Sequence, residues 1–113
     1  MPRNTNIKIN ANLVHSFSFH MLFLQLFQSL EGKEVTIELR NDIIVRGILQ
    51  SADQYYNFRI KDVKIINNPF YFNHKIDLLK DMFIRGSSIR YIRMNNEDVD
   101  LELLHDATRR YNQ

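Results

Sequence analysis

Two short segments of the chain combine residue types that could hold a nucleic-acid base. Asp53-Gln54-Tyr55-Tyr56-Asn57 contributes an acid, two tyrosines and an amide between two β-like runs, and Ile84-Arg85-Gly86-Ser87 also lies between two β-like runs. An aromatic ring offers a stacking face, an amide can read the edge of a base, and a guanidinium is a planar cation. If the fold brings the segments together, they form one small site for an unpaired base. The alternative is two ordinary hairpin turns.

The pattern around these segments predicts one helix followed by five short strands. Residues 21–30 have helical spacing of leucines and phenylalanines, and Gly32 can end that helix. A lone Gly47 inside a strand indicates a sharp bend or bulge, and a slip in the alternation indicates another bulge near Lys61-Asp62. The strands are predicted at residues 35–39, 43–50, 58–66, 76–84 and 88–94. The expected fold is all-β: an N-terminal α-helix followed by a strongly bent, five-stranded antiparallel small barrel.

The two ends of the chain differ from this middle part. Residues 1–20 are rich in asparagine at their start and contain no acid, which predicts a flexible N-terminal extension. A targeting segment is the less favoured alternative, because His20 and Gln25 interrupt the apolar stretch. Residues 95–113 are expected to form a tail with a short helix. The folded domain is therefore expected at residues 21–94.

Composition excludes several classes of function. One domain of 113 residues with a net charge of +2 and a pI of about 9.0 permits nucleic acid as a partner without requiring it. The chain has no cysteine, its four histidines have no metal-ligand spacing, and its three glycines are too far apart to cradle a phosphate. No uninterrupted apolar run is long enough to span a membrane. We expect no enzymatic activity, no metal and no cofactor.

Taken together, the two segments resemble the signature motifs of the Sm and Sm-like (LSm) proteins. Asp53-x-Tyr55-x-Asn57 after the Gly47 strand is similar to the first Sm motif, and Ile84-Arg85-Gly86-Ser87 is similar to the second. Four further stretches resemble the second subfamily of the Sm-like series: Met21-Leu22-Phe23, Asn41-Asp42, Phe83–Tyr91 and Leu103–Arg110. Because members of that subfamily typically begin with Met-Leu-Phe, the resemblance implies that residues 1–20 are an addition to it from an upstream start codon.

The resemblance implies a function for each residue of the site. Members of this family assemble into rings of seven, in which the fourth strand of one subunit pairs with the fifth strand of the next. Tyr55 would stack on a uracil base, Arg85 would cover its other face, and Asn57 would pair with its edge. Asp53 would steady the turn that carries the amide, and Gly86 would allow close approach of the backbone.

The resemblance also implies partners and a cellular location. In the nucleus, such a ring binds the uridine-rich single-stranded 3′ end of U6 small nuclear RNA for splicing; in the cytoplasm, a related ring binds shortened mRNA for decapping and decay. The implied partners are this RNA, other Sm-like subunits, and spliceosomal or mRNA-decay proteins, with no membrane. The implied location is the nucleus with a cytoplasmic pool.

Two alternatives and two departures accompany this interpretation. The chain could instead be a structural ring subunit with little RNA affinity, or a self-standing oligonucleotide-binding barrel. Tyr56 stands where the family usually has Met or Leu, and it either alters the pore wall or packs inward. The loop at Phe70–Phe72 is unusually aromatic, and packing of the loop on itself is favoured over contact with RNA or protein.

Overall fold

A computed structural model of the chain describes residues 6–14, 20–67, 78–100, 102 and 105. Within these ranges strands predominate, and the helices are short. The elements, in chain order, are β1 (Asn6–Asn10), α1 (Ala11–Val14), α2 (His20–Gln28), β2 (Glu34–Leu39), β3 (Ile44–Ala52), β4 (Phe58–Ile65), β5 (Leu78–Ile84), the 3-10 turn η2 (Gly86–Ser88), β6 (Ile89–Asn95) and the 3-10 turn η3 (Asn96–Asp98).

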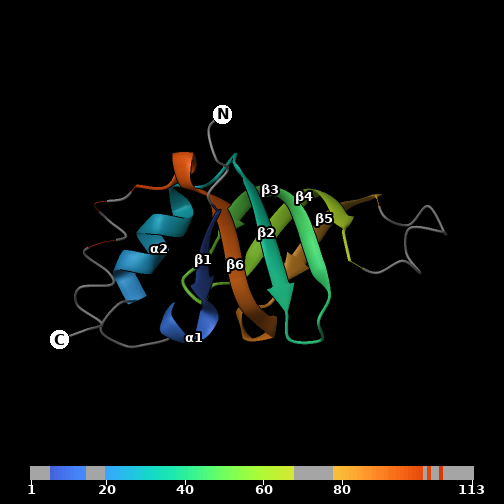
Figure 1. Ribbon diagram of the computed structural model, residues 1–113, viewed down its shortest axis with the longest axis horizontal. Helices are drawn as coiled ribbons and strands as arrows, with labels where there is room; N and C mark the ends of the chain where they lie inside the picture. Colours follow the sequence, from blue (N-terminus) through green and yellow to red (C-terminus); the bar gives the residue numbers. More distant parts are fainter. Residues whose placement is uncertain (1–5, 15–19, 68–77, 101, 103–104, 106–113) are drawn as a thin grey trace.

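The six strands form one antiparallel sheet in the order β1-β6-β2-β3-β4-β5. Figure 1 shows the sheet curling, with β3 sweeping from the front of the molecule toward the back and α2 lying beside the β1 and β6 end. Alternate residues of the strands point into the curl and are buried, as in β4, where Phe58, Ile60, Val63 and Ile65 belong to the core. The predicted bent all-β barrel with a preceding helix is confirmed.

Residues 6–14 differ from the expected flexible extension. Asn6–Asn10 form β1, which pairs along β6 from Asn6 opposite Asn95 to Asn10 opposite Tyr91. Ile9 is buried in the core, and Ile7 packs partly against it. The apolar-basic-apolar order of residues 7–9 is the strand signal, and the asparagine-rich, acid-free composition around it concealed that signal. The sheet therefore has six strands where the sequence predicted five.

Two predicted irregularities shape the curl. The register between β3 and β4 shifts between Arg46 and Ile48, around Gly47, and Asp62 has a φ of 55° on the facing strand. Both the bend at Gly47 and the bulge near Lys61-Asp62 are thus confirmed. A Cβ on Gly47 would lie 2.4 Å from Ile60 Cγ2 and 2.8 Å from the Lys61 carbonyl oxygen, so the strands can approach this closely only because the side chain is absent.

Helix α2 covers one end of the barrel through its aromatic face. Phe23, Leu26, Phe27 and Leu30 are fully buried, and the ring of Phe27 lies 5.4 Å from that of Phe58 between centroids. The helix therefore packs on its own sheet. α2 ends at Gln28, so the prediction that Gly32 ends the helix is wrong; with a φ of 87°, Gly32 lies in the turn that leads on to β2.

Two predicted features lie outside the described residues. These are the aromatic loop at Phe70–Phe72 and most of the expected helix in residues 95–113. The described start of that tail is η3, where the Asn95 side chain accepts a hydrogen bond of 3.0 Å from the Glu97 backbone N–H.

Replacing Gly47 tests whether the close approach of β3 and β4 holds the curl. Gly47→Ala should lower the free energy of unfolding by about 1–3 kcal/mol, because the added methyl meets a buried isoleucine and a backbone carbonyl that cannot both move away. Urea denaturation measures the change. Gln50→Ala, at an exposed position of the same strand, is the matched control and should shift stability by less than about 0.5 kcal/mol. Equal stability of the two variants would contradict the packing argument.

Candidate nucleic-acid interface

The turn between β3 and β4 is organised by the carboxylate of Asp53. Its Oδ1 accepts hydrogen bonds from the backbone N–H groups of Tyr55 at 2.9 Å and Asn57 at 3.0 Å, and its Oδ2 accepts one from Asn57 Nδ2 at 3.0 Å. Partial burial raises the pKa of Asp53, but the hydrogen bonds from Asn57 and Tyr55 outweigh that effect and hold the pKa below its usual value. The ionised carboxylate therefore fixes the shape of the turn at neutral pH.

A second turn, between β5 and β6, docks directly onto the first. The Gly86 backbone N–H donates a 2.9 Å hydrogen bond to Asn57 Oδ1. A Cβ on Gly86 would lie 2.5 Å from the Tyr55 carbonyl oxygen and 2.9 Å from that of Tyr56, so only glycine permits this approach. The two segments singled out in the sequence, 29 residues apart at this hydrogen bond, are thus brought together as predicted.

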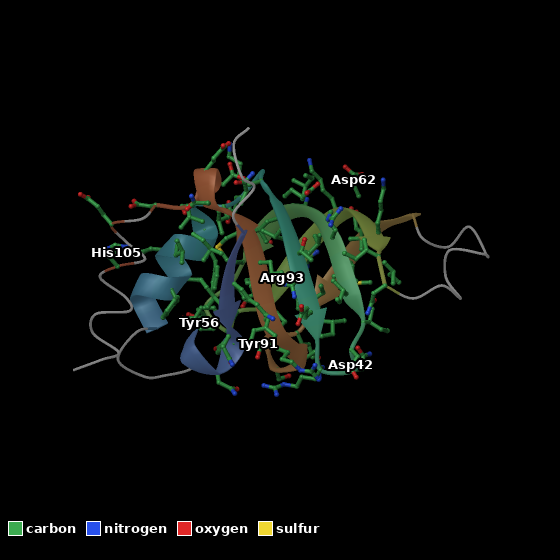
Figure 2. The ribbon with its side chains drawn as sticks, in the orientation of Figure 1. Asp42, Tyr56, Asp62, Tyr91, Arg93 and His105 are labelled. Carbon is green, nitrogen blue, oxygen red and sulfur yellow. The ribbon has the colours of Figure 1, made fainter. Side chains whose placement is uncertain are left out.

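The two tyrosines of the first turn have opposite environments. Tyr55 is 67% exposed, whereas Tyr56 is 2% exposed and makes an edge-to-face contact with Phe27 at 5.9 Å between ring centroids. Figure 2 shows Tyr56 at the end of the molecule that α2 covers. Burial raises the pKa of the Tyr56 phenol to about 12. Of the two possibilities for this departure from the family pattern, inward packing is the one observed.

Arg85 places an exposed cation next to the junction of the two turns. Its backbone is extended, with φ −69° and ψ 137°, and η2 begins at the following residue, Gly86. Among the described residues, the Arg85 guanidinium has no hydrogen-bond or ion-pair partner. The site thus presents an exposed ring on one turn, an exposed guanidinium on the other, and the Asn57 amide at the joint between them.

Two further arginines brace the second turn, and the sequence analysis missed both. Arg40 donates from its backbone N–H to the Ser88 carbonyl and from Nε to the Ser87 carbonyl, each at 2.9 Å. Arg90 in turn donates to the Arg40 carbonyl at 2.9 Å and to Asp42 Oδ1 at 2.7 Å. These contacts join residues 47 to 50 positions apart, so no local spacing could have revealed them.

The described residues hold no group of three or more His, Cys, Asp or Glu side chains that could bind a metal ion. Within the same ranges, no helix is long and apolar enough to cross a membrane. The chemistry on view at the joined turns is hydrogen bonding, stacking and positive charge.

Substituting Gly86 tests the junction. Gly86→Ala should lower the free energy of unfolding by about 1–3 kcal/mol, because the methyl would force the turn away from two backbone carbonyls and break the hydrogen bond to Asn57. Ser87→Ala is the matched control, since Ser87 is exposed and offers only its backbone carbonyl to Arg40. Thermal and urea unfolding measure both. A stable Gly86→Ala variant would show that the turns are not held in contact.

The raised pKa of Tyr56 predicts a pH dependence of stability. The neutral phenol is favoured by folding, so its contribution is complete below the ordinary pKa of 10.0 and is lost as pH rises toward about 12. The free energy of unfolding of wild type minus that of Tyr56→Phe should therefore stay constant up to pH 10 and then fall by up to about 2–3 kcal/mol. A constant difference up to pH 12 would contradict burial of the phenol.

Comparison with known proteins places this site within a matched domain. The LSM domain model matches residues 25–94, a range that contains both turns. Sm-like protein LSM2 of Arabidopsis thaliana is 43% identical over 90 residues, covering 80% of this chain and 95% of that protein. The probable U6 snRNA-associated Sm-like protein LSm2 of Dictyostelium discoideum is 46% identical over 89 residues, covering 79% of this chain and 74% of its own length. The predicted similarity to the second subfamily is confirmed.

A solved structure supports the same assignment at the level of the fold. The Sm protein of Pyrococcus abyssii, solved in complex with a uridine heptamer, superposes with a TM-score of 0.52 at 20% identity, covering 61% of this chain and 92% of that chain. The two proteins therefore share a fold. With the domain model matching most of the described barrel and full-length relatives above 40% identity, this chain belongs to the LSM-domain family of Sm-like proteins.

Proposed function

We propose that this chain is an RNA-binding subunit of a ring of Sm-like proteins, and that its joined turns take up one unpaired uracil base. The observation that supports this most directly is the 2.9 Å hydrogen bond from the Gly86 N–H to Asn57 Oδ1. It brings a turn with an exposed aromatic ring against a turn with an exposed guanidinium. Two π-faced groups beside one amide are suited to hold a single base.

Tyr55 is the stacking platform. Its ring is 67% exposed and its backbone is fixed by Asp53, so the ring projects from a fixed point of the turn and is not used in the core. Arg85 supplies a planar cation that can cover the other face of the base and attract the phosphate backbone. Stacking of one base on an aromatic side chain contributes about 1–3 kcal/mol.

Asn57 gives the site its preference for uracil. Its Oδ1 already accepts from Gly86 N–H and its Nδ2 already donates to Asp53 Oδ2, which fixes which way round the amide points. One lone pair on Oδ1 and one hydrogen on Nδ2 are left for a ligand. They match the N3–H donor and carbonyl acceptor of uracil. Cytosine presents an acceptor and a donor in the reverse order, and the amide cannot turn over to suit it.

The ring is the assembly that makes one weak pocket effective. The outer edge of β5 pairs with no other strand in the described part of the chain, and an unpaired strand edge is a surface for another strand. In the proposed ring of seven, β5 of one subunit pairs with β6 of the next. Several pockets facing one RNA then bind far more tightly than one.

The finer assignment concerns which RNA is bound and where. Relatives named as U6 snRNA-associated Sm-like proteins support the uridine-rich 3′ end of U6 RNA as a nuclear target. Shortened mRNA in a cytoplasmic pool, with decapping and decay proteins as partners, is the second target in this proposal. We infer that the chain acts by binding rather than by catalysis. The groups at the joined turns are suited to hold a nucleobase, and they do not pair a nucleophile with a general base that could activate it.

Alanine substitution in the assembled ring tests the pocket. With the chain co-expressed with the other Sm-like subunits of its organism, Tyr55→Ala or Arg85→Ala should weaken binding of fluorescein-labelled oligouridine by about fivefold to a hundredfold, measured by fluorescence anisotropy. Oligocytidine should bind the wild-type ring more weakly than oligouridine does. The size of each ring should be unchanged.

Lys64→Ala is the matched control for charge, since Lys64 is exposed on β4 two residues from Asp62, which Figure 2 shows far from Tyr56. It removes the same charge as Arg85→Ala and should leave binding within about twofold, apart from a small salt-dependent change. Unchanged binding by both site variants would favour the purely structural subunit. A wild-type chain that stays monomeric with all its relatives present would favour the self-standing barrel.

A further inference from the structure

The two edges of the sheet are in different states. At one end, β5 pairs only with β4 among the described strands, so its outer edge is open. At the other end, the outer edge of β6 is occupied by β1, which pairs with it over residues 6–10 (Figure 1). Figure 2 shows Tyr91 and Arg93 on β6 close beside this strand.

A head-to-tail ring uses both edges of every subunit. Each subunit offers β5 to one neighbour and receives the β5 of the other neighbour along β6. Backbone N–H and C=O groups that already pair with β1 cannot pair with an incoming strand. The chain as described can therefore give its β5 edge but cannot receive a neighbour on β6.

We infer that β1 is a displaceable strand that occupies the position of a neighbouring subunit's β5 and must leave β6 before this chain enters a ring. The inference rests on the proposed ring function and adds a control over entry into it. The partner that replaces β1 is the β5 edge of a sibling Sm-like subunit. The β6 edge is thus an interaction surface closed by the chain's own N-terminal segment.

β1 pairs with β6 and also contacts β2 through its lysine. Ile9 is 4% exposed, and Lys8 lies on the other face of the strand. There its Nζ is 3.9 Å from Glu38 Oε1 and 3.9 Å from the centre of the Tyr91 ring. The same Glu38 also accepts a hydrogen bond from Arg93 on β6. Apolar burial and a cation together give β1 one defined register.

These contacts are nonetheless weaker than those that a neighbour can offer. β1 has five residues and pairs with residues 91–95 of the seven-residue β6, so an incoming strand that also covers the rest of β6 makes a longer ladder. The Lys8 ion pair is partly exposed, and such pairs contribute little. Residues 6–10 also lie before the matched LSM domain at residues 25–94, so the family's barrel does not require β1. An intramolecular strand that forms first and yields to a longer partner fits these observations.

A reversible disulfide tests the inference in the full-length chain. The chain contains no cysteine, and Asn10 lies opposite Tyr91 in the register, at a spacing near what a disulfide spans. Asn10→Cys with Tyr91→Cys should tie β1 to β6 when oxidised. Mixed with the other Sm-like subunits of its organism, the oxidised variant should enter rings at least about tenfold more slowly than its reduced form. Native mass spectrometry and size-exclusion chromatography follow assembly, with no RNA present.

Thr36→Cys with Arg46→Cys is the matched control, because it ties β2 to β3, which stay paired in either state. Its oxidised and reduced forms should assemble at the same rate. A second variant, Ile9→Asp, removes the apolar anchor of β1 and should speed assembly about tenfold.

The outcomes separate this inference from the proposed function. Equal assembly by the oxidised and reduced Asn10–Tyr91 variant, with wild-type rings forming normally, overturns the inference alone and shows that β1 stays in place, with its own outer edge meeting the neighbour. An Ile9→Asp chain that assembles no faster than wild type also counts against it. Failure of every form to assemble overturns both the inference and the proposed ring.

Discussion

The arrangement of the site depends on a single side-chain amide. Asn57 accepts from the Gly86 N–H and donates to the Asp53 carboxylate, so it joins two turns that are far apart in the sequence and orients itself in doing so. Each partner of Asn57 must meet one requirement. The Asp53 carboxylate must be ionised to shape its own turn, and residue 86 must lack a side chain so that the two backbones can meet. A binding group that is also a structural joint has its geometry fixed before any ligand arrives, which reduces the ordering that binding requires.

The joint is in turn supported by the core. Tyr56 adopts a positive φ of 62° and turns inward against Phe27 of α2, while its neighbour Tyr55 remains in solvent. A residue other than glycine in this conformation is uncommon and needs compensation, which burial of the ring provides. Because Tyr55 and Tyr56 are adjacent, the packing of Tyr56 against α2 also determines that Tyr55 faces solvent. The stacking face is presented outward because the adjacent ring is used as an anchor.

Much of the fold and the composition of the site could be predicted from the sequence, because both depend on local patterns of residue types. Alternation located the strands, Gly47 marked a bend, and the slip in phase predicted the bulge at Asp62. What escaped prediction depends on long-range pairing. The bracing by Arg40 and Arg90 has no local trace, and the double use of the Asn57 amide appears only when both turns are in place. β1 escaped because three residues of alternation inside an asparagine-rich segment are too few to outweigh its composition.

The edges of the sheet show how one chain can be ready to assemble and still be protected while alone. An open edge invites pairing with any exposed strand, and charged residues within an edge strand discourage this. β5 carries the exposed Asp81, which suits an edge that is open while the chain is alone. β6 reads Ile-Arg-Tyr-Ile-Arg-Met-Asn and is covered by β1 instead. With β6 covered and β5 open, two copies of the chain cannot pair through β6. Such a chain can add its β5 to the β6 of another subunit, but it cannot accept the β5 of another subunit, so assembly proceeds in one direction. A strand supplied by the chain itself is a local occupant at high effective concentration, so it is outcompeted only by a partner that makes a longer and better-packed ladder.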